Sequence, residues 1–265
     1  MKKISFIVIG VLASLLLSSV FMPVASAADN KNKVIIPEEW HGKDKIVIPH
    51  SNLVEVIYIH YADSMANAEA AQHQKASYNG YDTLGWRWPS KGVSYVIDPT
   101  FMTTQGLSQA AVEGAIQNSF GAWNGAVPGL WTYGGLSTAK YSLLDEINVV
   151  TWGFIDDPNV IAVTHMWISY PIMDTLIDAD ILFNTMYTWG IDPDGEGPTM
   201  LIDAMFDIQD ICTHEAGHAL GLADLYATNY WPMTMYGYGY PGEINKISLE
   251  RGDSHGAQKV YRQVN

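Results

Sequence analysis

Residues 214–224 read HEAGHALGLAD, and this segment constrains both the structure and the chemistry of the chain. It continues a helical pattern that begins near Asp207, which is the predicted N-cap, with Asp210 in the first turn. His214 and His218 are four residues apart, so on a helix they lie one above the other on a single face. Two neutral imidazoles in that arrangement can hold one Zn²⁺ ion.

The residues that follow each histidine complete a metal site. Glu215 points beside the metal, where a general base would take a proton from water that the metal activates. Gly221 tolerates the left-handed backbone that ends helices, so the chain can turn there and bring Asp224 to the metal. The spacing H-E-x-x-H-x-x-G-x-x-D therefore predicts one catalytic zinc with three ligands, His214, His218 and Asp224, and one open position. For the short H-E-x-x-H pattern alone, an ordinary polar helix face is the alternative.

The N-terminus has the pattern of a cleaved export signal. Lys2 and Lys3 precede an apolar run, and small residues up to Ala27 offer a cleavage site. We predict a signal peptide over residues 1–27 and a secreted, extracellular mature protein with no membrane association. A membrane anchor is the alternative, but the apolar run is slightly short for one.

The mature chain is strongly acidic. The formal net charge is −14, and loss of the two lysines in the signal takes it to −16. This charge argues against nucleic acid as a partner, because phosphate binding needs Lys and Arg, and it suits a protein that binds cations. The chain has a single cysteine, Cys212, which excludes an intrachain disulfide and is interpreted as a buried packing residue.

Between the signal and the zinc motif, the sequence alternates predicted strands with one long helix. Residues 28–84 are interpreted as a propeptide or an N-terminal extension, and residues 85–265 as the main, catalytic domain. The long helix has Ser108 as its N-cap and ends near Gly125. Alternation predicts strands at 53–61, 92–98, 147–155, 161–169 and 175–185, and helical patterns cover 65–76, 207–220 and 249–261.

These segments resemble a metzincin metalloprotease, most closely the matrixin branch, over about residues 85–261. The zinc motif ends in Asp224, and an aspartate as third ligand is similar to that of the snapalysin family. Met235, before Tyr236, resembles the family's Met-turn, which passes under the zinc; Met233 is the alternative. The resemblance implies an α/β (α+β) fold. Its twisted, mostly parallel sheet would have an antiparallel edge strand, followed by an active-site helix and a C-terminal subdomain with the Met-turn.

The same resemblance implies where substrate binds. Residues 178–183 resemble the family's edge strand, which pairs with an extended peptide, and residues 236–241 resemble the wall of the side-chain pocket. The residues implied to bind substrate are Asp180, Ile181, Leu182, Phe183, Tyr236 and Tyr238.

Three features depart from the family pattern or leave its metal content open. Residues 28–84 contain no cysteine, so a thiolate that keeps a precursor latent is not expected. Only His165 lies where the family's structural zinc needs several histidines, and it is interpreted as a structural residue. Acidic turns offer oxygen donors for calcium, although solvated loops are the other interpretation; their residues are Asp156, Asp157, Asn159, Asp192, Asp194 and Glu196.

The sequence thus predicts a secreted, monomeric zinc metalloendopeptidase that acts on protein or peptide substrates, with Glu215 as the general base. One alternative is a non-catalytic zinc-binding protein of the same fold, in which a protein ligand such as His255 closes the fourth metal position. The other is a zinc hydrolase that acts on non-peptide amides.

Overall fold

The computed structural model describes residues 33–50, 52–64, 67, 71–72, 75–169, 175–195 and 204–262. The predicted signal peptide lies outside these residues, and so does most of the helix predicted at 65–76. No helix within the described ranges has the length and apolar character that crossing a membrane requires.

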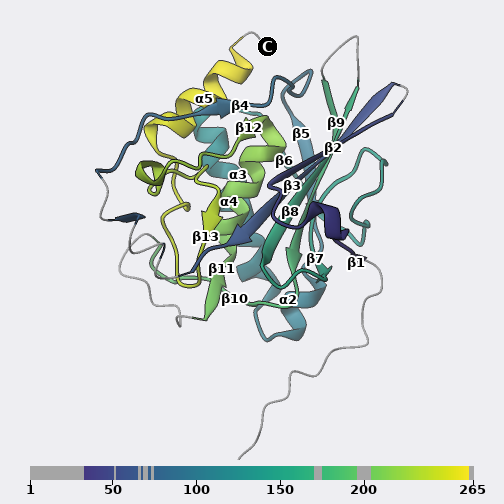
Figure 1. The fold of residues 1–265 in the computed structure, drawn as a ribbon. Helices are drawn as coiled ribbons and strands as arrows, with labels where there is room; N and C mark the ends of the chain where they lie inside the picture. The colour runs from purple at the N-terminus through teal and green to yellow at the C-terminus, as the bar shows by residue number, and fades with distance from the viewer. Residues whose placement is uncertain are drawn as a thin grey trace, which may run out of the picture.

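Most strands in the described part of the chain belong to one mixed sheet (Figure 1). They are β1 (Lys33–Val34), β2 (Lys45–Pro49), β3 (Leu53–Ala62), β5 (Val93–Ile97), β6 (Trp131–Leu136), β7 (Asn148–Ile155), β8 (Val160–Ser169), β9 (Thr175–Asn184) and β13 (Tyr238–Gly239). The order is β13-β3-β8-β9-β7-β5-β6, with β1 beside β7 and β2 beside β3. Strands β6, β5, β7 and β9 run parallel to one another. Strand β8 is antiparallel to β9. The predicted fold class is confirmed.

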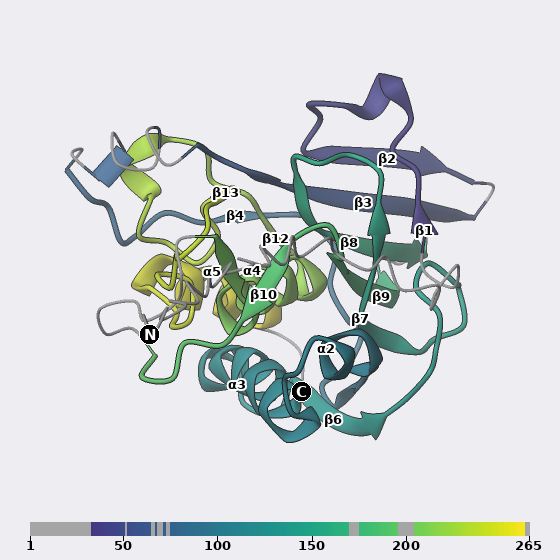
Figure 2. The ribbon, with the colours of Figure 1, turned by 90° about the horizontal axis from the view of Figure 1, so that it is seen from below.

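The helices cover one face of this sheet, as the view from below shows (Figure 2). They are α2 (Thr100–Thr104), α3 (Gln109–Ala126), α4 (Ile208–Leu220) and α5 (Arg251–Tyr261), with short 3₁₀ turns η1 (Glu38–Trp40) and η2 (Thr228–Tyr230). The opposite face is covered in part by Ile36 and Tyr141, which lie in a second apolar cluster. Because both faces are covered, the central strands β7, β8 and β9 are buried almost throughout.

The long helix α3 forms as its sequence predicts. The Ser108 side chain accepts a hydrogen bond from the backbone N–H of Ala111, which caps the first turn. The apolar face of α3 is buried, and Trp123 on that face donates its indole N–H to the carbonyl of Thr213 in α4. This face therefore fixes α4 between α3 and the sheet.

Both ends of α4 also agree with the sequence. Asp207 caps its start by accepting the N–H of Asp210 at 2.8 Å. At its end, Gly221 has φ of 114°, a left-handed conformation that favours glycine. A side chain there would also meet the carbonyl oxygen of Trp86. After this turn, β12 (Leu222–Ala223) pairs with β4 (Asp82–Thr83).

The prediction that residues 178–183 form the edge strand is wrong. They belong to β9, which pairs with β7 on one side and β8 on the other. Ile181 and Phe183 face the main core, and Leu182 faces the smaller cluster on the opposite side. Their backbone groups are already used within the sheet, so they have no free edge to offer a peptide.

Asp178 and Asp180 hold backbone of β7 and of the loop before it. The Asp180 carboxylate accepts the backbone N–H groups of Ser142 and Val149 at 2.8 and 2.9 Å. Asp178 accepts the N–H groups of residues 145 and 146. Burial raises the pKa of Asp180 to about 8, although these backbone donors oppose the shift.

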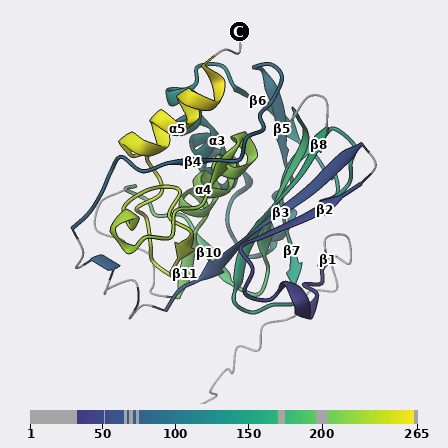
Figure 3. The ribbon, with the colours of Figure 1, turned by 45° about the horizontal axis from the view of Figure 1, so that its top comes forward.

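The described part of residues 28–84 extends the main sheet. The predicted strand at 53–61 is confirmed as β3, which pairs antiparallel with β8 from Leu53 opposite Ser169 to Tyr61 opposite Val160. On its other side β3 meets β2 and, at its end, β13. Figure 3 shows the N-terminal hairpin, β2 and β3, alongside β8. The strand β8, and not β9, is therefore the edge that β3 covers.

Candidate metal centre

Two turns of α4 and the segment after it bring three side chains to one point. The Nε2 atoms of His214 and His218 lie 3.1 Å apart. One carboxylate oxygen of Asp224, Oδ1, lies 3.2 Å from the first and 3.4 Å from the second. A tetrahedral zinc with bonds of about 2.0–2.1 Å separates its ligand atoms by about 3.3–3.4 Å. The three atoms therefore have the spacing of zinc ligands.

Backbone carbonyls orient both imidazoles. Nδ1 of His214 lies 2.8 Å from the carbonyl of Thr234, and Nδ1 of His218 lies 2.9 Å from that of Leu222. Because a carbonyl can only accept, each Nδ1 carries the proton and each Nε2 keeps its lone pair. Asp224 Oδ1 faces these lone pairs and is buried without a hydrogen-bond donor among the described residues. A cation is the partner that this arrangement fits.

The charges of the cluster also suit a cation. Burial lowers the pKa of His214 to about 4, so its imidazole is neutral at neutral pH and free to coordinate. Burial acts in the same direction on His218, but the Asp224 carboxylate outweighs it and raises that pKa. Burial would raise the pKa of Asp224, yet the two imidazoles hold it well below its usual range. The carboxylate is therefore ionised.

Glu215 leaves α4 on the side that faces the sheet. Its Oε2 accepts the hydroxyl of Thr164 in β8 at 2.5 Å, and its Oε1 lies 3.1 Å from Nδ1 of His60. Burial raises the pKa of Glu215. A carboxylate with a raised pKa next to a metal site is suited to accept a proton and then release it near neutral pH.

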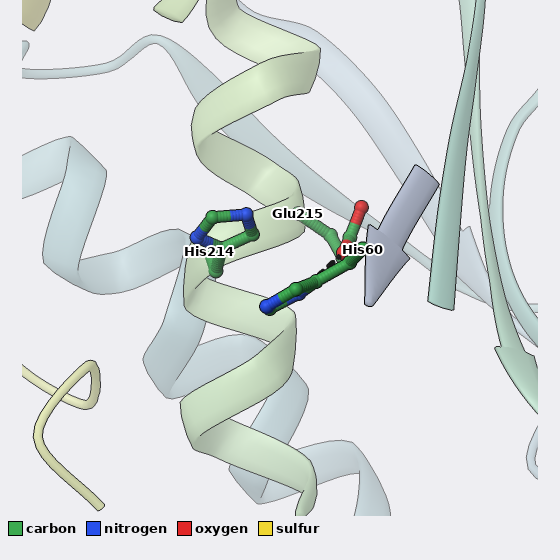
Figure 4. A group of neighbouring side chains, drawn as sticks. All are labelled: His60, His214 and Glu215. Carbon is green, nitrogen blue, oxygen red and sulfur yellow. Dashed lines mark hydrogen bonds and ion pairs between the residues drawn. The ribbon is translucent and has the colours of Figure 1, made fainter. Parts of the chain in front are cut away.

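His60 is a site residue that the sequence did not reveal. It extends from β3 toward α4, where its ring lies against His214 with centroids 4.1 Å apart and contacts Glu215 (Figure 4). His60, His214 and Glu215 form a second cluster with metal-binding atoms within 4.8 Å of one another. Two residues earlier, Tyr58 stacks on His218 at 4.2 Å. The one sequence signal was a polar residue on an otherwise apolar strand face.

Met235 lies directly beneath the helix that carries the histidines. A Cβ built on Gly217 would come within 2.2 Å of Met235 Sδ, so α4 approaches this turn as closely as a glycine allows. Asp253 of α5 accepts the backbone N–H groups of Thr234 and Met235, at 3.0 and 3.2 Å, and holds the turn in place. Met233 is also buried, but Met235 is the methionine in contact with Gly217.

The remaining predicted substrate residues fall into two groups. Tyr236 and Tyr238 lie edge to face, 5.8 Å apart, and Tyr238 pairs with Tyr61 of β3, so they flank the end of that strand. Asp180 belongs to neither metal-binding cluster among the described residues, and its neighbours in β9 are enclosed by the sheet.

The other metal-related predictions have mixed outcomes. His255 is exposed on α5 and belongs to neither cluster. His165 pairs with Glu55 of β3 at 2.7 Å, in agreement with a structural role, and Cys212 is buried as predicted. No residue of the described acidic turns belongs to the two clusters, and Glu196 lies outside the described residues. Calcium stays a prediction.

Comparison with known proteins gives one clear relationship. The matrixin family model matches residues 87–262, which is most of the chain. The match extends from the segment before β5 to the end of α5, and it includes α4, the turn at Met235 and the three clustered residues. No curated protein matches the chain. Matrixins are peptidases with a catalytic zinc, and the chain therefore belongs to the matrixin family of zinc metallopeptidases.

Proposed function

We propose that this chain is a secreted zinc endopeptidase in which His214, His218 and Asp224 hold the metal and Glu215 is the general base. One observation carries the proposal: two imidazole nitrogens and one carboxylate oxygen converge within 3.4 Å, and that oxygen has no hydrogen-bond donor among the described residues. The acidic composition and the N-terminal signal pattern support export, and calcium in the acidic turns and a monomeric state are part of the same proposal.

Zinc, when bound, polarises a carbonyl oxygen and lowers the pKa of a water molecule to about 7. Glu215 accepts the proton of the water that adds to the peptide carbonyl carbon, and it passes this proton to the nitrogen as the C–N bond breaks. The Thr164 hydroxyl donates to Oε2 of Glu215, so we assign the proton transfer to Oε1, the other carboxylate oxygen.

The edge of β8 is the proposed docking strand for substrate. An extended peptide that adds to an exposed sheet edge gains backbone hydrogen bonds along its length. Thr164, which touches Glu215, is in the middle of β8, so the edge continues in both directions from the reacting bond. A polypeptide can therefore extend past the site on both sides, which favours endopeptidase over exopeptidase activity. Tyr236 and Tyr238 are proposed to shape the pocket beyond the cut.

The two alternatives make different use of the same residues. A non-catalytic zinc protein has no need of a buried acid at the position of Glu215, and this observation favours the enzyme. A hydrolase of non-peptide amides would keep Glu215 but would have no need of a long edge such as β8.

Removal of zinc should abolish peptide-bond hydrolysis, because both water activation and carbonyl polarisation depend on the metal. We would measure casein hydrolysis by the full chain and by a shorter chain that begins at Ala76, before and after dialysis against a chelator. Activity that disappears on chelation and returns with zinc supports the proposal. If both chains bind zinc and neither cleaves casein, the non-catalytic alternative or the amide hydrolase replaces it.

A further inference from the structure

The edge at which substrate would bind is filled by the chain itself. β3 pairs with β8 along nearly its whole length, including Tyr58 opposite Thr164, the residue that touches Glu215. At its other end β3 runs parallel to β13, where Tyr61 lies opposite Tyr238. An extended segment thus lies between the proposed docking strand and the proposed pocket wall. In this state the chain has no room for a second peptide.

Side chains of β3 also cover the metal centre. The side chains of His60 and Glu215 are both fully buried where His60 Nδ1 and Glu215 Oε1 meet at 3.1 Å. His60 lies against one zinc-ligand ring, and Tyr58 stacks on the other. The alternation of the strand puts both residues on the face toward α4, whereas Ile57 and Ile59 face the opposite cluster. Access for water and for a carbonyl is blocked at the general base.

The 3.1 Å polar contact of His60 is with Glu215, whereas the coordinating atoms of the three proposed zinc ligands lie against one another. His60 shares a cluster with His214 and Glu215, and the cluster of His214, His218 and Asp224 does not include it. A metal can therefore remain bound while the general base is engaged. This differs from a thiolate on the metal, for which residues 28–84 offer no cysteine.

The catalytic part of the sheet is complete without β3. The family match begins at residue 87, after β3, and contains β5 to β9 with β8 as its outermost strand. The chain is held again after the hairpin, where Gly252 of α5 packs against the backbone of Gly80 and Leu84 donates its N–H to Gly221. Residues 33–64 could leave without removing β5 to β9, α4 or the turn at Met235, whereas β13 would lose β3, its partner strand in the described sheet.

We propose that the N-terminal hairpin, β2 and β3, is an intramolecular inhibitor that keeps the full chain latent by covering β8 and engaging Glu215 through His60. This inference rests on the proposed zinc peptidase function. Cleavage of the chain after Ser64 turns the hairpin into a separate peptide, which loses the high effective concentration of a tethered segment and dissociates on dilution. Peptide-bond hydrolysis at that point releases the edge of β8 and the carboxylate of Glu215 together.

The test uses the full chain with Co²⁺ in place of zinc, because the visible spectrum of the ion reports ligand access without any need for turnover. A recognition sequence for a specific protease is inserted after the exposed Ser64, and acetohydroxamate is the small probe. We expect the uncut chain to bind acetohydroxamate at least about 100-fold more weakly than the cut and diluted chain, because only the open fraction of molecules can bind. Casein hydrolysis should appear only after the cut.

A pair of substitutions in the uncut chain separates the imidazole from the strand. His60→Ala should admit acetohydroxamate to the metal but still exclude casein, because the β3 backbone remains on β8. Ile57→Ala, on the opposite face of the same strand, should loosen β3 as a whole, so probe binding and casein hydrolysis should rise together. If His60→Ala fails to fold, the comparison of cut and uncut wild-type chains still decides the matter.

Each result has one meaning. If probe binding and casein hydrolysis are the same before and after the cut, the hairpin is not an inhibitor. The proposed peptidase function would be unaffected by that result. Equal responses of His60→Ala and Ile57→Ala, or a closed His60→Ala, would show that His60 does not close the site. A chain that binds neither Co²⁺ nor zinc at His214, His218 and Asp224 would remove the proposed function itself.

Discussion

Replacing Glu215 with alanine should lower kcat/KM for casein by about 10²–10⁴-fold, the range expected when a general acid–base group is removed. Zinc should remain bound, because Glu215 is not one of the three clustered ligand residues His214, His218 and Asp224. The measurement is casein hydrolysis by the chain that begins at Ala76, together with zinc content by elemental analysis. Loss of turnover with full zinc occupancy separates the acid–base step from metal binding.

A matched variant tests whether replacing a different glutamate also lowers casein turnover. Glu113 of α3 accepts a hydrogen bond from the Tyr133 hydroxyl and lies outside both metal-binding clusters. Glu113→Ala should therefore leave turnover close to that of the wild type. Turnover that survives in Glu215→Ala would rule out the general-base role, whatever the control shows.

Replacing Asp224 with alanine should weaken zinc binding by more than about 100-fold. Loss of a residue that only supports a ligand costs about 10–100-fold, so loss of a ligand costs more. The two histidines would then face each other with lone pairs 3.1 Å apart and no carboxylate between them. Competition with a chromophoric chelator measures the affinity. Zinc affinity equal to that of the wild type would show that another group is the third ligand.

Two further substitutions should give zinc affinities between those of the wild type and Asp224→Ala. Asp224→His keeps a ligand at the position and should restore most of the zinc affinity, because three imidazoles form an ordinary zinc site. Tyr226→Phe removes the hydroxyl that donates to Asp224 Oδ2 at 3.0 Å and keeps the ligand itself. Its zinc affinity should fall by about 10–100-fold, between those of the wild type and Asp224→Ala.

The parts of the centre that follow from local chemistry could be predicted from the sequence. The i, i+4 spacing fixes His214 and His218 on one face of α4. Gly221 has the left-handed backbone that its place after the helix requires, and this turn returns Asp224 to the histidines. The cap at Asp207 and the buried face of α3 are local in the same sense.

The strand order could not be predicted in this way. Residues 178–183 resembled the family's edge strand, but Asp180 accepts backbone N–H groups from Ser142 in a loop and Val149 in β7, more than 30 residues away in sequence. Sequence periodicity shows that a strand has two faces and does not show which strands lie beside it. The assignment of Ile181, Leu182 and Phe183 to substrate binding failed for this reason.

The role of β3 is a matter of long-range contact as well. His60 and Glu215 are 155 residues apart in sequence, and β3 pairs with a strand about a hundred residues later. The pattern of residues 53–61 was enough to predict a strand, and nothing in it identified β8 as its partner. The absence of cysteine in residues 28–84 argued against a thiolate and gave no indication of an imidazole contact.

The most direct test of the metal centre is anomalous scattering at the zinc absorption edge from crystals of the full chain. We expect a single strong peak, about 2.0–2.2 Å from Nε2 of His214, from Nε2 of His218 and from a carboxylate oxygen of Asp224. A peak bound by other residues would contradict it. So would a chain that folds and cleaves peptides with no transition metal in this position.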